Sequence, residues 1–466
     1  MAERKRPPMQ RIAALPADAL ATVCRPDDLP FASTDEVPDL GVILGQQRAL
    51  QAIQFGLNAA RPGYNLFVFG SSGIGKHSTV MRLLSERARQ GPVPPDLCYV
   101  ANFEEPSKPR LLQLPAGRGA ELRRDMQHLV EELVGSLPAA FESDEFKARL
   151  RQIEQTFEQR QIGAIRDLRE KSEAQDVKLF EQPGEFTFAP LHNGQVLDVE
   201  AFNQLPEDTR NAIEDKVSKL QAELTRILDE LVPEWQKERR AAIRSLRRET
   251  TRAVVRQLLT GLRSQHADLP AVSDYLDSVE RQVIHNARDF LQREGADAVA
   301  AGDLSGFRNY QVNLLVDHGT SQGAPVIFED NPTFMALVGR IEHQAQFGAL
   351  VTDFNLIRAG ALHRANGGYL VIDAHKLLTQ PFAWEGLKRT LRAGELRIES
   401  LGQAWSLIST VSLEPQPLPL DVKIALEGDR VLYYLLQAYD PEFAELFKVA
   451  ADFEDSIDRT PETLDS

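Results

Sequence analysis

Apolar residues near the start of the chain first recur at the spacing of a helix and then run together as in a strand. A helix over 46–57 would carry four of them on one face, Ala49, Leu50, Ile53 and Leu57. The run 64–69 is apolar and stops at a glycine, which predicts a buried strand followed by a new helix from about Gly75. A second apolar run, 97–102, predicts another strand.

Between residues 116 and 310 the pattern becomes helical and rich in Glu, Arg, Gln, Leu and Ala. Within it, apolar residues alternate in steps of four and three, a heptad spacing typical of packed helices: Ile213, Val217, Leu220, Leu224, Ile227 and Leu231. We therefore expect two helices to form a coiled-coil-like arm, which Pro233 kinks or divides. Asn193-Gly194 separates 185–188 from 195–198, and this turn signal predicts a small β-hairpin within the arm.

From residue 311 the pattern returns to strands and helices. Three more buried strands are expected, over 312–316, 369–372 and 422–426. Together with the two early strands they suggest one mostly parallel sheet between helical layers. The expected fold class is thus a three-layer α/β core with a parallel sheet, interrupted by a long, mostly helical insertion. The expected division is a lead-in over 1–40, a first core part over 41–115, the insertion over 116–310 and a second core part over 311–466.

A glycine-rich segment lies where the first strand should pass into the next helix. It consists of Gly70, Ser71, Ser72, Gly73, Ile74, Gly75 and Lys76, which fit the first seven positions of a P-loop. Glycines allow backbone N–H groups to close around phosphate oxygens, and the helix N-terminus adds a favourable dipole. Lys76 would reach the terminal phosphates. A chance glycine-rich turn is the alternative. The eighth position, whose hydroxyl normally holds magnesium, is His77, and Ser78 is the nearest hydroxyl.

A second candidate site feature is an aspartate at the end of a later apolar strand. Asp373 closes the run 368–373 as in a Walker B strand, where a carboxylate can hold magnesium. A turn-forming aspartate is the alternative. The next residue, where a glutamate normally activates water, is Ala374. His363 and His375 lie near this strand, but no third metal ligand has a fitting spacing, so we interpret both as polar loop histidines.

Composition and charge exclude few classes. The 466 residues are 42% hydrophobic and 26% charged with a formal net charge of −15, which argues against a general nucleic-acid or membrane-surface coat. No signal peptide or membrane-spanning run is recognisable, and Cys24 and Cys98 have no metal-ligand spacing, so a cytoplasmic protein with two reduced thiols is expected. One basic pattern recurs every four residues: Arg240, Arg244, Arg248, Arg252 and Arg256. It is either a solvated helix face or a stripe that follows nucleic-acid phosphates.

Several segments together resemble the AAA+ part of the Lon-related ATP-dependent proteases. They are LGQQRAL over 44–50, GYNLFVFG over 63–70, YVANFEEP over 99–106, LPAGRG over 114–119, EDNPT over 329–333, AGALHRANGGYL over 359–370, PLDVK over 419–423, GDR over 428–430, LFKV over 446–449 and ADF over 451–453. A helical insertion between the P-loop and the Walker B strand is also a mark of this family. The resemblance extends from about residue 20 to the end of the chain.

The resemblance implies ATP and Mg²⁺ as cofactors and assigns roles to single residues. Ile43 to Gln46 would lie near the adenine, Gly70 to Ser78 near the phosphates, and Asp373, with Ser78, near the metal. Asp429 or Arg430 falls where AAA+ proteins place a polar sensor. Lys448 lies where a neighbouring subunit's arginine finger is expected, and it would be the trans-acting group.

The resemblance further implies an ATP-driven module that unfolds protein substrates or delivers them to a serine–lysine peptidase domain. That domain would follow Ser466, so no peptidase activity is expected from this chain alone. The family also implies a homo-oligomeric, hexameric ring, which we expect this chain to form only weakly. Two other hypotheses remain open. Ala374 and His77 favour a nucleotide-binding interaction module with slow or no hydrolysis, and the arginine pattern would fit a DNA-associated ATPase.

Overall fold

A computed structural model describes residues 14–16, 31–36, 45–182, 185–192, 194–291, 305–346, 349–398 and 413–457. Its centre is a five-stranded parallel sheet in the order β17-β1-β16-β13-β8. The strands are β1 (Leu66–Phe69), β8 (Val326–Glu329), β13 (Gly368–Asp373), β16 (Val422–Gly428) and β17 (Val449–Asp452). β1, the strand that leads into the glycine-rich segment, therefore lies inside the sheet, between β17 and β16.

Helices cover both faces of this sheet because its strands are apolar on both sides. Leu66 and Val68 pack on the side of α1 (Gln47–Asn58) and α2 (Lys76–Ala88). Phe67 and Phe69 point to the other side, where they join a larger cluster. The helices of that side are α11 (Phe334–Val338), α12 (Ala361–Arg364), α13 (Ala374–Thr379), α14 (Ala383–Ala393), α16 (Arg430–Tyr439) and α17 (Pro441–Leu446). The three-layer α/β fold class is thus confirmed.

The expectation that all five predicted strands share one sheet is wrong. The second early strand, β2 (Asp96–Val100), lies between β3 (Arg110–Leu114) and β7 (Asn313–Val316) in a separate antiparallel sheet. The parallel sheet is completed instead by β8 and β17, which are only four residues long. A buried apolar run shows that a strand is covered, whereas its partners depend on the chain's connections. Here a short loop returns β3 directly onto β2.

Short elements connect these layers. They are η3 (Thr34–Glu36), η5 (Ser305–Tyr310), β9 (Arg340–Ile341), β10 (Gln344–Gln346), β11 (Ala349–Val351), η6 (Phe354–Leu356), β12 (Ile357–Arg358), β14 (Glu395–Leu396) and β15 (Leu418–Pro419). β9 pairs with β12, β10 with β11, and β14 with β15, each antiparallel. None of the helices within the described ranges has the length and apolar character of a membrane span.

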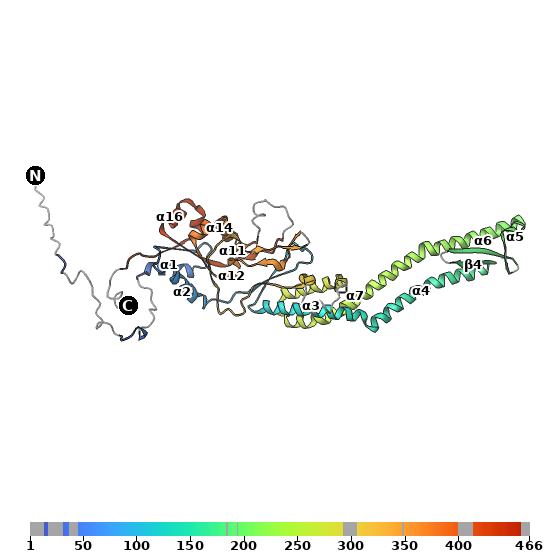
Figure 1. The fold of residues 1–466 in the computed structure, drawn as a ribbon, viewed down its shortest axis with the longest axis horizontal. Helices are drawn as coiled ribbons and strands as arrows, with labels where there is room; N and C mark the ends of the chain where they lie inside the picture. The colour runs from blue at the N-terminus through green and yellow to red at the C-terminus, as the bar shows by residue number, and fades with distance from the viewer. Residues whose placement is uncertain are drawn as a thin grey trace.

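A long helical arm projects from the core, as Figure 1 shows. Its base has its own apolar cluster, in which α7 packs against α3 and α8. Its helices are α3 (Arg118–Glu142), α4 (Asp144–Glu173), α7 (Val232–Gln265), α8 (Pro270–His285) and α9 (Ala287–Leu291). Ser143 separates α3 from α4 and caps α4, because its hydroxyl accepts a hydrogen bond from the Phe146 N–H at 3.3 Å. The helical insertion is therefore confirmed as an arm of paired helices.

The far end of the arm carries the predicted hairpin and the predicted heptad seam. Its elements are β4 (Val177–Gln182), β5 (Glu185–His192), β6 (Gln195–Val196), α5 (Val199–Asn203), α6 (Glu207–Arg226) and the π-helical turn η4 (Ile227–Leu231). β5 pairs with β6 across the Gly194 turn and also with β4, a strand that the sequence pattern did not reveal. Pro233 does not divide the helix, because α6, η4 and α7 follow one another without a break and with helical backbones at their junctions. The π-helical turn lies just before this proline, where a normal helical hydrogen bond to its missing N–H cannot form.

Candidate functional site

The glycine-rich segment forms a loop at the carboxyl end of β1 and leads into α2. Gly73 and Gly75 both have left-handed backbones, with φ of +83° and +80°. No atom lies within 4 Å of the point where a Cβ would stand at either residue. A side chain would therefore occupy open space above the loop and strain its backbone. The residues fit a bound phosphate, because the loop is an open concavity before the N-terminus of a helix.

Lys76 is the first residue of α2, and its side chain turns back over the loop. Its Nζ donates hydrogen bonds to the carbonyl oxygens of Gly70 at 2.5 Å and Ser71 at 2.9 Å. Burial lowers the pKa of Lys76, and four nearby carboxylates act in the opposite direction: Glu427, Asp429, Asp373 and Asp455. One of them, Asp455, also accepts a hydrogen bond from the Ser71 N–H at 3.3 Å. The candidate phosphate-binding lysine thus has four carboxylates in its surroundings.

His77 is held by a glutamate that the sequence pattern did not point to. Its Nδ1 lies 3.1 Å from Oε2 of Glu427, and its ring meets the edge of Phe328 with the centroids 4.7 Å apart. Glu427 sits on β16, level with Val68 of β1 and Asp373 of β13, and its side chain is only 12% exposed. Burial raises the pKa of Glu427, the charge of Asp373 adds to this, and His77 and Lys76 oppose it.

The expected magnesium ligands do not form a cluster. Asp373 ends β13 at the correct edge of the sheet, but its Oδ1 caps α13 by accepting a hydrogen bond from the Lys376 N–H at 2.8 Å. Ser78 is exposed on α2, and no hydrogen bond joins it to Asp373 within the described ranges. No group of three or more His, Cys, Asp or Glu side chains in these ranges could hold a metal ion. Mg²⁺ at a nucleotide needs only one or two protein ligands, but here His77 replaces the usual hydroxyl and Oδ1 of Asp373 is engaged as a helix cap. These residues therefore fit Mg²⁺ poorly, and we derive no step through it.

Ala374 is buried, with 1% of its surface exposed, and it belongs to the apolar cluster below α13. It follows Asp373 directly, so no carboxylate at this position is available to orient a water molecule. His375 is exposed on α13. The interpretation of His363 as a polar loop residue is wrong. It lies in α12, is 1% exposed and accepts a hydrogen bond from the Gly360 N–H at 3.2 Å.

The residues suggested as sensor and trans-acting group have other contacts in this chain. Asp429 caps α16 by accepting a hydrogen bond from the Leu432 N–H at 2.7 Å, and it lies near Lys76. Arg430 contacts Asp452 at 3.0 Å. Lys448 packs over the Tyr64 ring at 5.3 Å, just before β17 and at the opposite end of the sheet from the P-loop. It therefore lies away from the P-loop of its own chain.

Three further sequence-based candidates can be placed. Ile43 and Cys24 lie outside the described residues, whereas Gln46 binds the backbone of Glu454 through both side-chain atoms at 2.9 Å. Cys98 is buried in β2, which raises its pKa to about 12. Of the arginine pattern, Arg256 binds Glu280 at 2.9 Å. The remaining members are exposed on α7 and form no ion pair within the described ranges: Arg240, Arg244, Arg248 and Arg252.

A parallel sheet with a P-loop at its carboxyl edge and a helical insertion defines an AAA-type P-loop core. The family model of a LonB-like AAA domain matches residues 322–454, and that of a Lon-like LonC helical domain matches residues 96–129. A Lon protease homolog of Escherichia coli (strain K12) is 29% identical over 197 residues. The match covers 41% of this chain and 30% of that protein, so this chain spans less than a third of the relative.

These matches support a Lon-related family for this chain, and an AAA domain of this kind implies nucleotide binding. Among solved structures, NtrX from Brucella abortus covers 28% of this chain and 27% of its own at 18% identity and a TM-score of 0.20. That likeness is too low to carry an argument about the fold.

Proposed function

We propose that residues 70–76 bind the phosphates of ATP and that the chain is the nucleotide-binding AAA module of a Lon-type protein. The observation that carries this proposal is the open loop of Gly73 and Gly75 at the N-terminus of α2, with Lys76 beside it. In this proposal the phosphates replace the Gly70 and Ser71 carbonyls as partners of the lysine amine. Backbone N–H groups and the helix dipole add to the attraction.

The finer parts of the proposal concern what nucleotide binding does. ATP binding would reposition the arm and the core of neighbouring copies in a homo-oligomeric ring, hexameric in the complete assembly. Lys448 of one copy would then approach the nucleotide of the next, since it cannot reach the P-loop of its own chain. Protein substrates would be unfolded or delivered to a peptidase domain. The proposed units are 41–115 and 311–466 for the core, 116–310 for the arm and 1–40 for the lead-in.

A second candidate function is a nucleotide-binding interaction module in which hydrolysis is slow. Two observations favour it. Ala374 is buried and apolar where a water-activating carboxylate is expected. His77 is engaged with Glu427 where a metal-binding hydroxyl is expected. In this alternative the bound nucleotide changes the conformation of the chain, and the arm holds partner proteins. Binding and turnover therefore have to be measured separately.

Titration with a fluorescent ATP analogue tests the site. Lys76→Ala removes the positive charge together with the amine's hydrogen bonds to the Gly70 and Ser71 carbonyls, and we expect it to weaken binding by about tenfold or more. Lys219→Ala is a matched control, because Lys219 is an exposed lysine that pairs with Asp215 on α6, in the arm far from the loop. Equal affinity of the wild type and Lys76→Ala would refute the assignment. Phosphate release at saturating nucleotide then separates the two candidate functions.

A further inference from the structure

The apolar seam of α6 continues beyond the part that the arm covers. Leu220 and Leu224 are 1% and 4% exposed, because they pack against α4 and the β4–β5 hairpin. Ile213 and Val217 continue the same heptad spacing toward the tip, but they line an open cavity of about 800 Å³. Both side chains are only partly exposed, and Val217 also packs against the edge of the same apolar cluster. The open cavity leaves the rest of this apolar surface in contact with water, which is unfavourable.

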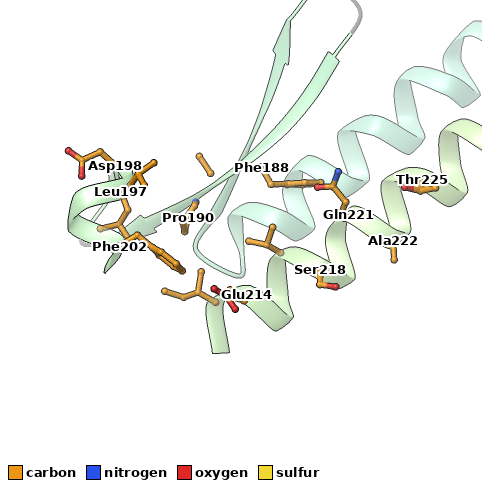
Figure 2. Close-up of a pocket in the computed structure, with 14 residues that line it drawn as sticks. Phe188, Pro190, Leu197, Asp198, Phe202, Glu214, Ser218, Gln221, Ala222 and Thr225 are labelled. Carbon is orange, nitrogen blue, oxygen red and sulfur yellow. The ribbon is translucent and has the colours of Figure 1, made fainter. Parts of the chain in front are cut away.

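Three elements form this cavity, which we call the tip groove. Its wall opposite α6 consists of Phe188–Pro190 of β5 and residues 197–199 and 202 around α5, and its α6 wall includes Glu214, Ser218 and Gln221. Figure 2 shows Pro190 and Phe202 on one side of this space and Glu214 on the other. The volume lies within the range of about 300–1,000 Å³ typical of ligand sites.

The walls of the tip groove are held by bonds of their own. The Leu197 N–H donates to the carbonyl of Pro190 at 3.0 Å. Asp198 caps α5, since its Oδ1 accepts a hydrogen bond from the Ala201 N–H at 2.7 Å. The groove is thus preformed, which lowers the entropic cost of filling it. Beside this framework, Val199 remains 79% exposed and Val196 48% exposed.

The charge around the groove indicates which apolar partner fits. Residues 195–215 contain six acidic residues and one basic residue, Arg210. Asp198 and Glu214 line the groove, and neither forms an ion pair within the described part of the arm. A partner with acidic side chains would be repelled here, whereas lysine or arginine beside apolar residues would complement both the walls and the rim.

We propose that the tip groove binds a short apolar segment of another polypeptide that carries lysine or arginine among its apolar residues. This inference rests on the proposed function, because a module that unfolds or delivers protein substrates needs a surface that binds them. α5 and the start of α6, which carry residues that line the groove, lie at the end of the arm far from α2, as Figure 1 shows. Occupation of the groove and that of the nucleotide site are therefore separable in experiment.

Fluorescence anisotropy with the full chain tests the proposal. The probe is a short fluorescein-labelled peptide of alternating Leu, Phe, Lys and Arg, and its counterpart has Glu and Asp in place of the basic residues. We expect saturable binding of the basic peptide that weakens with added salt, and at least about tenfold weaker binding of the acidic one. Equal binding of both peptides, or no binding of the basic peptide, would overturn the proposal.

Variants locate the binding. Val199→Asn removes exposed apolar surface and should weaken binding of the basic peptide about fivefold, while Ile162→Asn, which changes a 60% exposed isoleucine on α4, should not. Glu214→Lys should weaken it about tenfold and reduce the salt dependence, whereas Glu132→Lys on α3 makes the same charge change away from the groove. If the controls weaken binding as much as the groove variants, the peptide binds elsewhere and the proposal is wrong.

Two other occupants would be recognised in the same experiments. Analytical ultracentrifugation that shows a wild-type dimer, lost in Val199→Asn, would assign the groove to a second copy and overturn the proposal. Binding of the wild type, but not of Val199→Asn, to anionic lipid vesicles without peptide binding would assign it to a membrane surface. ATP-analogue titration of Val199→Asn should match the wild type. If Lys76→Ala fails to weaken nucleotide binding, only the proposed function is affected.

Discussion

The Nδ1 atom of His77 lies 3.1 Å from Oε2 of Glu427, although 350 positions separate the two residues in the chain. Glu427 belongs to β16, which lies between β1 and β13. Its carboxylate therefore reaches the space beside the P-loop, at the edge where both neighbouring strands end. Lys76 and His77 thus face a largely buried acid, and Asp373 stands level with it. This arrangement determines how the site should respond to substitution.

Glu427→Gln should strengthen ATP binding. The substitution removes a negative charge close to Lys76, where triphosphate would add several more. We expect a gain of about 1 kcal/mol, roughly fivefold in affinity, measured by titration with a fluorescent ATP analogue. Glu385→Gln, an exposed acid on α14, is the control. Weaker binding by Glu427→Gln would mean that this carboxylate holds the nucleotide, for example through a cation.

Wild-type turnover should be slow, and Ala374→Glu should raise it by about tenfold or more at saturating ATP and magnesium. A positioned general base contributes about 10²–10⁴-fold in rate. Because Ala374 is only 1% exposed, part of the gain would be offset by the packing cost of a larger side chain. Ala374→Gln carries the same packing cost without the base, so the two variants are compared by phosphate release. Ordinary AAA rates in the wild type, unchanged in Ala374→Glu, would contradict this interpretation of position 374.

Asp440→Asn should destabilise the core by about 1.5 kcal/mol. Lys388 has a side chain that is only 6% exposed, and its Nζ lies 2.9 Å from Oδ2 of Asp440, which also accepts the Trp384 indole N–H at 2.7 Å. In the variant Lys388 loses the charge of its most buried partner, but it keeps Glu385 at 2.9 Å and Glu442 at 3.4 Å, so the loss is moderate. Denaturant unfolding measures the change. Lys388→Met should cost less, because Asp440 keeps its bond from Trp384, and an equal or greater loss in Lys388→Met would show that the ion pair is not the main contribution.

His363 should make the stability of the core depend on pH. Burial lowers the pKa of His363 to about 3, from an ordinary value of 6.5. The neutral form is thus favoured in the folded chain. The stability that a neutral His363 allows is fully present above the pKa of this histidine in the unfolded chain. It is lost as the pH falls toward the pKa of His363 in the folded chain. The expected loss is about 2 kcal/mol by about pH 5.

Two variants test this pH dependence, one at His363 itself and one at a second histidine as the control. His363→Gln keeps an acceptor for the Gly360 N–H but does not titrate, so the difference in its unfolding free energy from the wild type should shrink or reverse as the solution is acidified. His128→Gln changes a 77% exposed histidine on α3 and should leave the wild-type pH profile intact. Parallel profiles for the wild type and His363→Gln would contradict the prediction.

The sequence by itself determined the local features. Apolar spacing predicted α1, β1 and α2, and the glycines between the last two define the P-loop, because both depend on neighbours in the chain. The heptad seam predicted an arm whose inner residues Leu220, Leu224 and Ile227 are buried. Tertiary structure alone decided which strands pair, because apolar runs in different strands are interchangeable. It therefore moved β2 out of the parallel sheet and brought Glu427 to His77. At the tip, the seam's pattern continues through Ile213 and Val217, but only the tertiary structure decided that an open cavity lies beside them, because the facing wall comes from β5 and α5.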